Sequence, residues 1–435
     1  MSQLQHRVPM RWPPLCALVL AASAATAATP APPPPLPQTH CPTVLLVDAE
    51  FRDAALRQLD RLVVNAPGKS AHGAVFSHHS AGHVDVQGRA WHQVSAYQVN
   101  LGLIGALHVS PRALPLVAGW LQWQMRHIAP IGAVRGVVLD HWVREGDLEE
   151  STCPPGMAKK LCGHVDAYDS TAASTLLMAD AYLRHGGDVM LLRQPAMRQA
   201  LEAAATALRE LAVDEGLTLA KPDYRIVYTM DVVEVAASWR AWARLQRNAY
   251  AEPQSAMNSQ ATAELAEARL RTRLWNAKVG AWRVGLDASA LQPERWYPDT
   301  VAQAWPLLWG TEPAGAAAAR ATWNRAVAPW QIAKRHWADT TVDPDGFMWP
   351  AAAVAAACTG DVASARRWVA RARQRWLQPG EVFAWPFQVG DLLWLMWLAE
   401  PLQPPRPASA IPDTNAATVA VSSLDLSLRP TRKML

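Results

Sequence analysis

The feature of this chain that most constrains its fold is the length of the connectors between its amphipathic segments. Apolar residues at helical spacing predict twelve helices between about residues 45 and 400. Most connectors from an odd-numbered helix to the next even-numbered one are long, whereas three of those from an even-numbered to an odd-numbered helix are tight. Antiparallel helix pairs closed into a ring produce this alternation. The sequence therefore predicts an all-α fold, an (α/α)6 barrel of six helical hairpins with one elaborated face.

Helix-start and helix-stop residues set the predicted boundaries. Ser110 and Pro111 form an N-cap pair before the third helix, and Gly186-Gly187 ends the fourth. Strand-like runs at 133–139 and 280–286 predict small β-hairpins on the elaborated face. The predicted helices are 47–64, 94–108, 111–128, 168–185, 195–213, 229–246, 258–275, 299–309, 314–337, 349–358, 361–377 and 386–399.

The two ends of the chain differ in composition from the helical region. Residues 1–27 have the pattern of a secretory signal peptide, with a basic start, an apolar run too short to span a bilayer, and the cleavage site Ala25-Thr26-Ala27. Residues 28–44 predict a proline-rich spacer, 45–400 the helical domain, and 401–435 a disordered tail. We therefore expect a periplasmic or secreted protein with no stable membrane span after cleavage. A retained N-terminal anchor is the alternative.

The cysteines could form disulfides, and the cysteines and histidines could bind a metal ion. Cys153 and Cys162 bracket a short Pro-Gly loop and are expected to form a disulfide in an oxidising compartment, with reduced buried thiols as the alternative. The cysteine spacings do not match a zinc site. Five histidines around the first long connector are expected to be exposed loop residues: His72, His78, His79, His83 and His92. We therefore expect no metal and no cofactor.

Charge distribution bears on nucleic-acid binding. The 41 basic and 37 acidic residues give a formal net charge of +4, and no clustered Lys/Arg run is present. Proteins that bind nucleic acid carry a basic patch or stripe. We therefore expect no nucleic-acid partner.

Acidic residues gather where the long connectors lead into even-numbered helices. An acid there can simply cap the helix. Sugar hydrolysis, however, needs two carboxyl groups flanking the scissile bond, and the mouth of the ring can supply them from several hairpins. Asp231 and Glu234, three residues apart, point to one helix face. The catalytic candidates are Asp166, Asp169, Asp231, Glu234, Asp299 and Glu381.

Tryptophan is unusually frequent, with 21 Trp against 5 Phe and 7 Tyr. Its large flat ring with a hydrogen-bond donor suits the C–H faces of sugars, although Trp can also replace Phe as a core residue. For the tryptophans in long connectors, both roles remain open. The candidate substrate-binding residues are Tyr97, Asp140, Trp142, Tyr168, Trp296, Tyr297, Trp349 and Trp385.

Four segments at the starts of even-numbered helices carry a resemblance to a known family: Val94–Asn100, Asp166–Ala173, Met230–Val235 and Trp296–Gln303. Through them the chain resembles the six-hairpin glycosidase-like superfamily of (α/α)6 toroids. Its members include glucoamylase-like and endoglucanase-like hydrolases, unsaturated glucuronyl hydrolases and phosphorylases. The resemblance implies a general base between the eleventh and twelfth helices, a position that Glu381 matches by topology.

Together these features favour an exported glycoside hydrolase that cleaves an oligo- or polysaccharide by carboxylate acid/base catalysis. One alternative is a polysaccharide lyase on the same toroid, for which Tyr168, Tyr297 or His92 would matter more than the carboxylates. Another is a non-catalytic protein that binds sugar or assembles envelope polysaccharide. In each case the expected partner is a carbohydrate.

Overall fold

The computed structural model describes residues 45–129, 135–213, 216–288, 291–309, 317–332, 336–378 and 382–399. The expected signal peptide, proline-rich spacer and C-terminal tail lie outside the described residues, and so does Glu381.

Each predicted helical segment contains a helix. They are α1 (Ala49–Leu62), α2 (Ala96–Val109), α3 (Ala113–His127), α4 (Tyr168–Arg184), α6 (Pro195–Leu211), α7 (Thr229–Asn248), α8 (Pro253–Arg269), α9 (Trp305–Trp309), α10 (Ala317–Val327), α11 (Pro350–Cys358), α12 (Val362–Trp376) and α13 (Asp391–Ala399). A short helix that was not predicted, α5 (Val189–Arg193), follows α4, and Asp188 caps it by accepting from the backbone N–H of Met190. A π-helical turn, Leu270–Leu274, follows α8. The segment Trp296–Thr300, which precedes α9, is kinked at Tyr297, whose φ of −110° and ψ of 135° are not helical.

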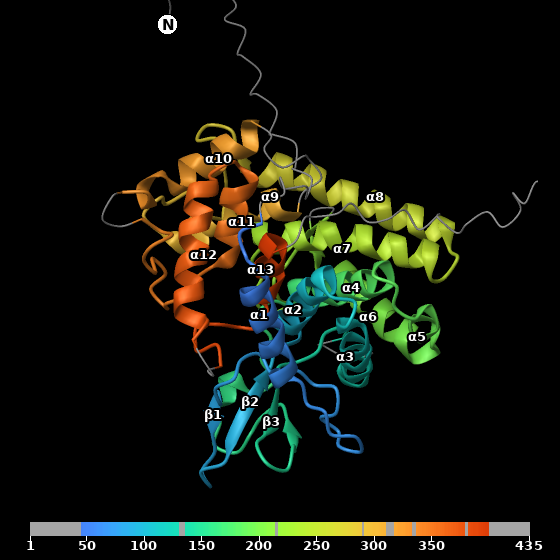
Figure 1. Ribbon diagram of the computed structural model, residues 1–435. Helices are drawn as coiled ribbons and strands as arrows, with labels where there is room; N and C mark the ends of the chain where they lie inside the picture. The colour runs from blue at the N-terminus through green and yellow to red at the C-terminus, as the bar shows by residue number, and fades with distance from the viewer. Residues whose placement is uncertain are drawn as a thin grey trace, which may run out of the picture. The chain divides into compact units, whose positions relative to one another are not determined.

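The second helix of each hairpin lies in a closed inner ring. Going round it, α2 contacts α4, then α7, α9, α11 and α13 follow in turn, and α13 contacts α2 again. The outer helices pack on this ring, as α8 does on α7 and α12 on α11 (Figure 1). The predicted (α/α)6 barrel of six helical hairpins is therefore confirmed.

Inner and outer helices differ in how much of their surface they bury. Every residue of α11 is buried, so this helix is apolar on all sides. In α12, by contrast, a stripe containing Ala365, Trp368 and Ala372 is buried, and arginines occupy the solvent side. A helix that is apolar all round belongs in a core, whereas one with a single apolar stripe covers it. The side-chain pattern thus assigns helices to the two layers.

The ring closes where α2 meets α13, and glycine makes the contact possible. A Cβ on Gly102 would lie 2.3 Å from the carbonyl oxygen of Val389, and one on Gly105 would lie 2.5 Å from that of Leu392. Any side chain at these positions would force the two backbones apart. These glycines therefore set the distance between α2 and α13, the first and last inner helices.

Small antiparallel sheets decorate the long connectors. β1 (His83–Val84), β2 (Ala90–Val94), β3 (His141–Arg144) and β4 (Glu150–Ser151) form one sheet in that order. Two further hairpins are β5 (Ala212–Val213) with β6 (Leu217–Thr218), and β7 (Trp275–Asn276) with β8 (Ala281–Trp282). The hairpin expected near 280–286 is present, whereas the strand expected at 133–139 begins later, at His141. The expected disulfide between Cys153 and Cys162 is also present, just after β4.

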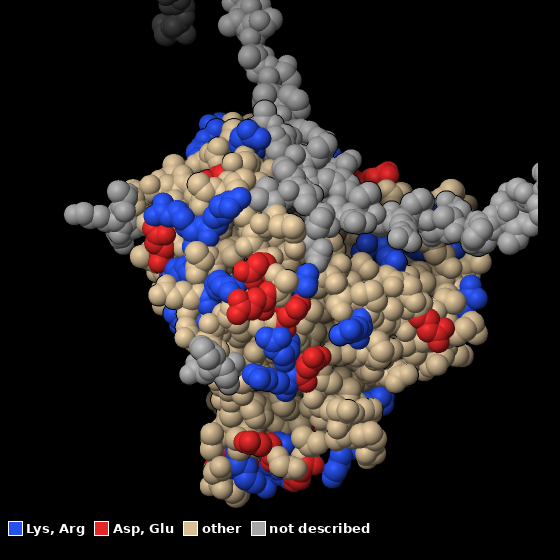
Figure 2. All heavy atoms as spheres, in the orientation of Figure 1, with Lys and Arg blue, Asp and Glu red and all other residues tan. Residues whose placement is uncertain are grey.

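The described surface mixes charges of both signs. On the face shown in Figure 2, basic and acidic side chains are interspersed. Arg373 of α12, for example, pairs with Asp48, the residue that caps α1. Within the described ranges, none of the helices has the length and apolar character needed to cross a membrane.

Candidate active site

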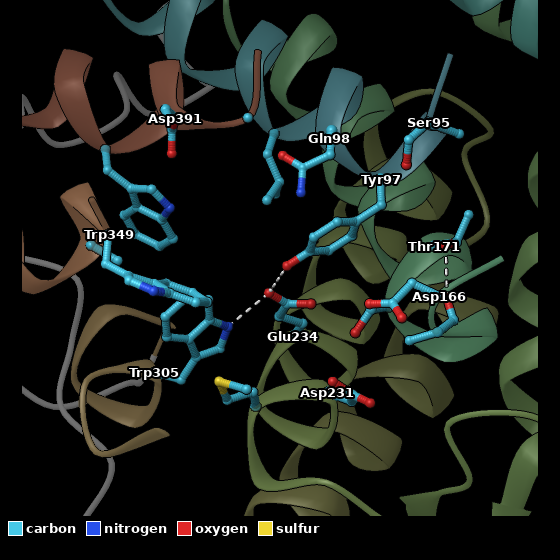
Figure 3. Close-up of a pocket in the computed structure, with 18 of the residues that line it drawn as sticks. Ser95, Tyr97, Gln98, Asp166, Thr171, Asp231, Glu234, Trp305, Trp349 and Asp391 are labelled. Carbon is cyan, nitrogen blue, oxygen red and sulfur yellow. Dashed lines mark hydrogen bonds between the residues drawn. The ribbon is translucent and has the colours of Figure 1, made fainter. Parts of the chain in front are cut away.

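A cavity of about 220 Å³ opens at the mouth of the barrel. Each of the six inner helices contributes residues from its N-terminal end or from the segment just before it, as expected if the starts of the even-numbered helices converge (Figure 3). The connector after α3 adds Val138 and Asp140. The other lining residues are Ser95, Ala96, Tyr97, Gln98, Leu101, Asp166, Ala167, Ser170, Thr171, Met230, Asp231, Glu234, Tyr297, Trp305, Trp349, Pro350, Ala351, Gly390, Asp391 and Trp394.

Glu234 of α7 is the most firmly held acid in the pocket. Tyr97 Oη and Trp305 Nε1 both donate to Glu234 Oε1, each at 2.8 Å, which ties α7 to α2 and α9. Burial raises the pKa of Glu234 to about 7, although both donors lower it. Burial, followed by the charge of Glu234, also raises the pKa of Tyr97 well above its usual value. Tyr97 therefore acts as a hydrogen-bond donor in this pocket.

Asp231 lies one helical turn before Glu234 and has a different environment. Its Oδ2 is buried and has no hydrogen-bond partner among the described residues. Burial raises its pKa well above the usual value, and the negative charges of Asp169, Glu234 and Asp166 raise it further. A buried carboxyl among other acids is disfavoured in its charged form. The protonated form of Asp231 is therefore favoured more strongly than that of an ordinary aspartate.

Asp169 does not line the pocket, although it lies close enough to influence Asp231. Its Oδ1 accepts from the backbone N–H of Ser170 at 2.8 Å, and its Oδ2 accepts from Thr218 Oγ1 at 2.7 Å. Burial raises its pKa to about 7. Both oxygens are thus occupied, so Asp169 links α4 to β6 and acts on the pocket through its charge.

Asp391 is an acid of the pocket that the sequence analysis missed. It is the first residue of α13 and lies on the wall opposite Asp231 and Asp166 (Figure 3). Burial raises its pKa to about 7, and its Oδ2 accepts from the backbone N–H of Gln388 at 3.0 Å. The signal that could have revealed it is the pattern used for the other acids, a carboxylate at the start of an even-numbered helix. A Cβ on the preceding Gly390 would clash with Gln98 Oε1, so a larger residue there would displace the Gln98 side chain from the pocket wall.

Aromatic rings form the wall between α9 and α11. Trp349 stacks on Tyr297 with ring centroids 4.8 Å apart and planes 19° from parallel. Its Nε1 donates to Asp343 Oδ2 at 2.7 Å, and its backbone has a φ of +50°. A bulky residue in the left-handed region is strained, and such strain is concentrated at functional sites. Trp305 completes this wall.

The pocket brings together seven of the residues singled out from the sequence: Asp166, Asp231, Glu234, Tyr97, Asp140, Tyr297 and Trp349. Asp140 is held there by Gln93, whose Nε2 donates to Asp140 Oδ2 at 2.9 Å.

Other candidates lie elsewhere. Asp299 accepts from the backbone N–H of Gln292 at 2.9 Å and does not line the pocket. Trp142 and Trp296 are buried in the core, and Tyr168 is half-buried outside the pocket lining. Trp385 is 46% exposed beyond the pocket. Helical periodicity in the sequence predicts where each helix lies along the chain. Whether a side chain near the start of a helix faces the pocket depends also on the path of the connector before that helix.

The histidines of the first long connector differ from the expectation. His72 is exposed, but His78, His79 and His92 are half-buried. Burial lowers the pKa of each of these three, which favours the neutral form. Among the described residues, no group of three or more His, Cys, Asp or Glu side chains is arranged to hold a metal ion.

Comparisons with known proteins bear on the fold. No protein-family model matches the chain, and a search of curated protein sequences finds no match. Among solved structures, a glycosidase variant is similar with a TM-score of 0.52 and 14% identity, covering 81% of this chain and 96% of its own. A glycosidase variant in complex with glucose is similar with a TM-score of 0.50, 15% identity and the same coverage. At these identities the likeness shows the fold alone, and it agrees with the (α/α)6 barrel described above.

Proposed function

We propose that the barrel-mouth pocket hydrolyses a glycosidic bond, with Asp231 as the proton donor and Asp391 as the facing carboxylate. The observation that carries this proposal is the position of two carboxyl groups, one from α7 and one from α13, on opposite walls of one pocket (Figure 3). Glycoside hydrolysis needs one carboxyl on each side of the scissile bond. The aromatic wall of Trp305 and Trp349 would hold the sugar between them.

The environment of Asp231 suits a general acid. Its Oδ2 has no hydrogen-bond partner among the described residues, and its pKa is raised well above the usual value by burial and by neighbouring acids. A protonated carboxyl can give its proton to the departing glycosidic oxygen as the bond breaks. Glu234, with Oε1 already occupied by Tyr97 and Trp305, would orient the substrate by accepting from a sugar hydroxyl through its other oxygen.

The pocket lining favours an uncharged sugar. Its described lining residues include no Lys, Arg or His. They include five acids: Asp140, Asp166, Asp231, Glu234 and Asp391. A polysaccharide lyase must neutralise the carboxylate of a uronate, which needs a cation nearby. The ionised members of this group of acids would repel a uronate instead. The composition of the site therefore favours hydrolysis of a neutral sugar over the lyase alternative.

Four variants test the proposal, measured for release of reducing ends from neutral oligosaccharides. Asp231→Asn and Asp391→Asn should each lower turnover by at least about 10²-fold, a typical acid–base contribution. Asp299→Asn is the matched control, because Asp299 is a buried acid in a helical turn outside the pocket. Glu381→Gln tests the candidate general base that the family resemblance implies. Loss of turnover in Glu381→Gln with retention in Asp391→Asn would remove Asp391 from the catalytic pair.

We also infer that the protein is exported, as residues 1–27 indicate. The disulfide between Cys153 and Cys162 supports an oxidising compartment. N-terminal sequencing of the protein recovered from the producing cell tests this inference. A mature chain beginning at Ala28 is expected, and an uncleaved chain recovered in the cytoplasm would contradict export.

A further inference from the structure

We infer that the substrate is a carbohydrate chain that leaves the pocket along an aromatic strip made of Tyr297, Trp349, Phe347 and Trp385. The inference rests on the proposed function, because it assigns the part of the substrate that lies outside the pocket. It adds a preference of the enzyme for longer chains over short glycosides.

The four rings form an uninterrupted series. Ring centroids are 4.8 Å apart for Tyr297 and Trp349, 6.2 Å for Trp349 and Phe347, and 5.4 Å for Phe347 and Trp385. The first two residues line the pocket, whereas Phe347 and Trp385 lie beyond it. The strip therefore begins at the reacting end of the substrate and leads outward.

Exposure separates these rings from the other tryptophans of the long connectors. Trp385 and Tyr297 are 46% and 45% exposed, and Trp349 and Phe347 are half-buried. Trp91, Trp142, Trp282 and Trp296, in contrast, are at most 8% exposed and serve as core residues. Contiguous exposed apolar surface beside a pocket marks a binding site. Flat rings with accessible faces suit the C–H faces of successive sugars.

The size of the pocket indicates that a longer substrate must continue outside it. Its volume of about 220 Å³ is below the roughly 300 Å³ at which pockets begin to enclose drug-sized ligands. A single sugar ring can fill it, and further units of a chain must then lie on the surface. The strip is continuous with the pocket wall through Tyr297 and Trp349, so it provides that surface.

A second route out of the pocket supplies a matched control. A neighbouring cavity shares Asp166, Asp231 and Tyr297 with the pocket and is lined by Tyr224, which is 46% exposed, as Trp385 is. This cavity also contains the charged residues Lys221 and Asp223. Because its lining is more polar than the strip, we assign the chain to the strip. Tyr224→Ala then removes an equally exposed ring from the other route.

The test uses cello- and malto-oligosaccharides from the disaccharide to the hexasaccharide, together with an aryl monoglycoside. Trp385→Ala and Phe347→Ala should lower kcat/KM by roughly 3- to 10-fold on the longer chains, the loss expected from one aromatic stacking contact. They should leave the aryl monoglycoside unchanged. Tyr224→Ala should have little effect on either class. An equal loss on all substrates, or a length-dependent loss confined to Tyr224→Ala, would overturn the assignment.

Binding separates failure of the strip from failure of the proposed chemistry. The dissociation constants of the same oligosaccharides are measured by calorimetry with Asp231→Asn, alone and combined with Trp385→Ala. Affinity that rises with chain length and falls when Trp385 is removed supports the strip, even if hydrolysis is absent. The assignment of the chain to the strip would be overturned if the affinity for both the cello- and the malto-oligosaccharides were independent of chain length. It would also be overturned if Trp385→Ala left these affinities unchanged.

Discussion

At the scale of single residues, the pocket is a group of carboxyls whose pKa values burial has raised. Glu234 and Asp391 have pKa values of about 7, and that of Asp231 lies well above its usual value. The largest cause is burial in each case. The same groups that would perform acid–base chemistry near neutral pH therefore also link the stability of the fold to pH.

The pH dependence of hydrolysis follows from the two facing acids. Activity requires Asp391 ionised and Asp231 protonated, so kcat/KM should rise with pH through about 7 as Asp391 loses its proton. It should fall at higher pH as Asp231, whose pKa is raised well above its usual value by burial and neighbouring acids, loses its proton. A pH profile of kcat/KM on a neutral oligosaccharide checks this. An optimum below pH 5 would contradict the assigned roles.

Removing the Asp391 carboxylate should stabilise the protein at alkaline pH. Its pKa is about 7 in the folded chain against an ordinary value of 3.8. A raised folded pKa gives stability that is complete below the unfolded pKa and is lost as pH rises through the folded pKa. Asp391→Asn should therefore raise Tm by at least about 2 °C at pH 8, with a difference that shrinks toward pH 4. A lower Tm at pH 8 would show that the carboxylate is structurally required.

Sequence patterns identified several acids of the site and missed one. Asp231 and Glu234 were found because they begin a helix after a long connector and share one face of it. Asp391 was missed because the last helix was expected to begin at residue 386, which placed this acid inside the helix rather than at its start. Exposure of Trp349 and burial of Trp142 could not be distinguished from sequence, because burial depends on packing between segments distant in the chain.

At the scale of elements, the contact between α2 and α13 places the last acid of the pocket. Because Gly102 and Gly105 have no side chain, the backbone of α2 can contact the backbone of the α13 segment directly. Asp391 begins α13, and Tyr97 lies in the first turn of α2. The separation of these helices therefore sets the position of Asp391 relative to Glu234, to which Tyr97 donates. Packing at the centre of the ring thus controls geometry at its mouth.

Gly105→Ala should destabilise the protein, although Ala is the better helix former by about 1 kcal/mol. The added Cβ would lie 2.5 Å from the carbonyl oxygen of Leu392, and overpacking of this kind costs about 1–3 kcal/mol. Gly119→Ala in α3 is the control, because a Cβ there meets no atom within 4 Å. Chemical denaturation of both variants measures the free energy of unfolding. Equal stability of the two variants would show that α2 and α13 do not need this close approach.

The hairpin pattern was predictable from connector length, but several local features were not. The expected helices were found because apolar periodicity and cap residues act within a few residues of one another. The short α5 was not predicted, although Asp188 caps it locally, because its five residues are too few to show apolar periodicity. The kink at Tyr297 in Trp296–Thr300 was not predicted either. The strand expected at 133–139 begins instead at His141, where it pairs with β2 of another connector.

At the scale of the whole molecule, the closed ring is what turns separate helix starts into one site. The lining residues of the pocket come from the six inner helices, the segments just before them and the connector after α3, and are spread from Ser95 to Trp394 along the sequence. No single segment carries enough of the site to reveal its chemistry. For this reason the sequence predicted which end of the barrel carries the site but did not predict all of the residues that line it. The likeness to a glycosidase structure extends over 81% of the chain and concerns the fold alone.

The most direct test of the central proposal is the product formed by the purified wild-type protein on a panel of neutral and uronate-containing polysaccharides. Reducing ends and the absorbance of unsaturated products are measured together. We expect reducing ends to be released from at least one neutral polysaccharide, with no rise in unsaturated-product absorbance, because the described pocket lining contains five acids and no basic side chain. Unsaturated products from a uronate polysaccharide, or no release from any neutral one, would contradict a hydrolase site at the mouth of this barrel.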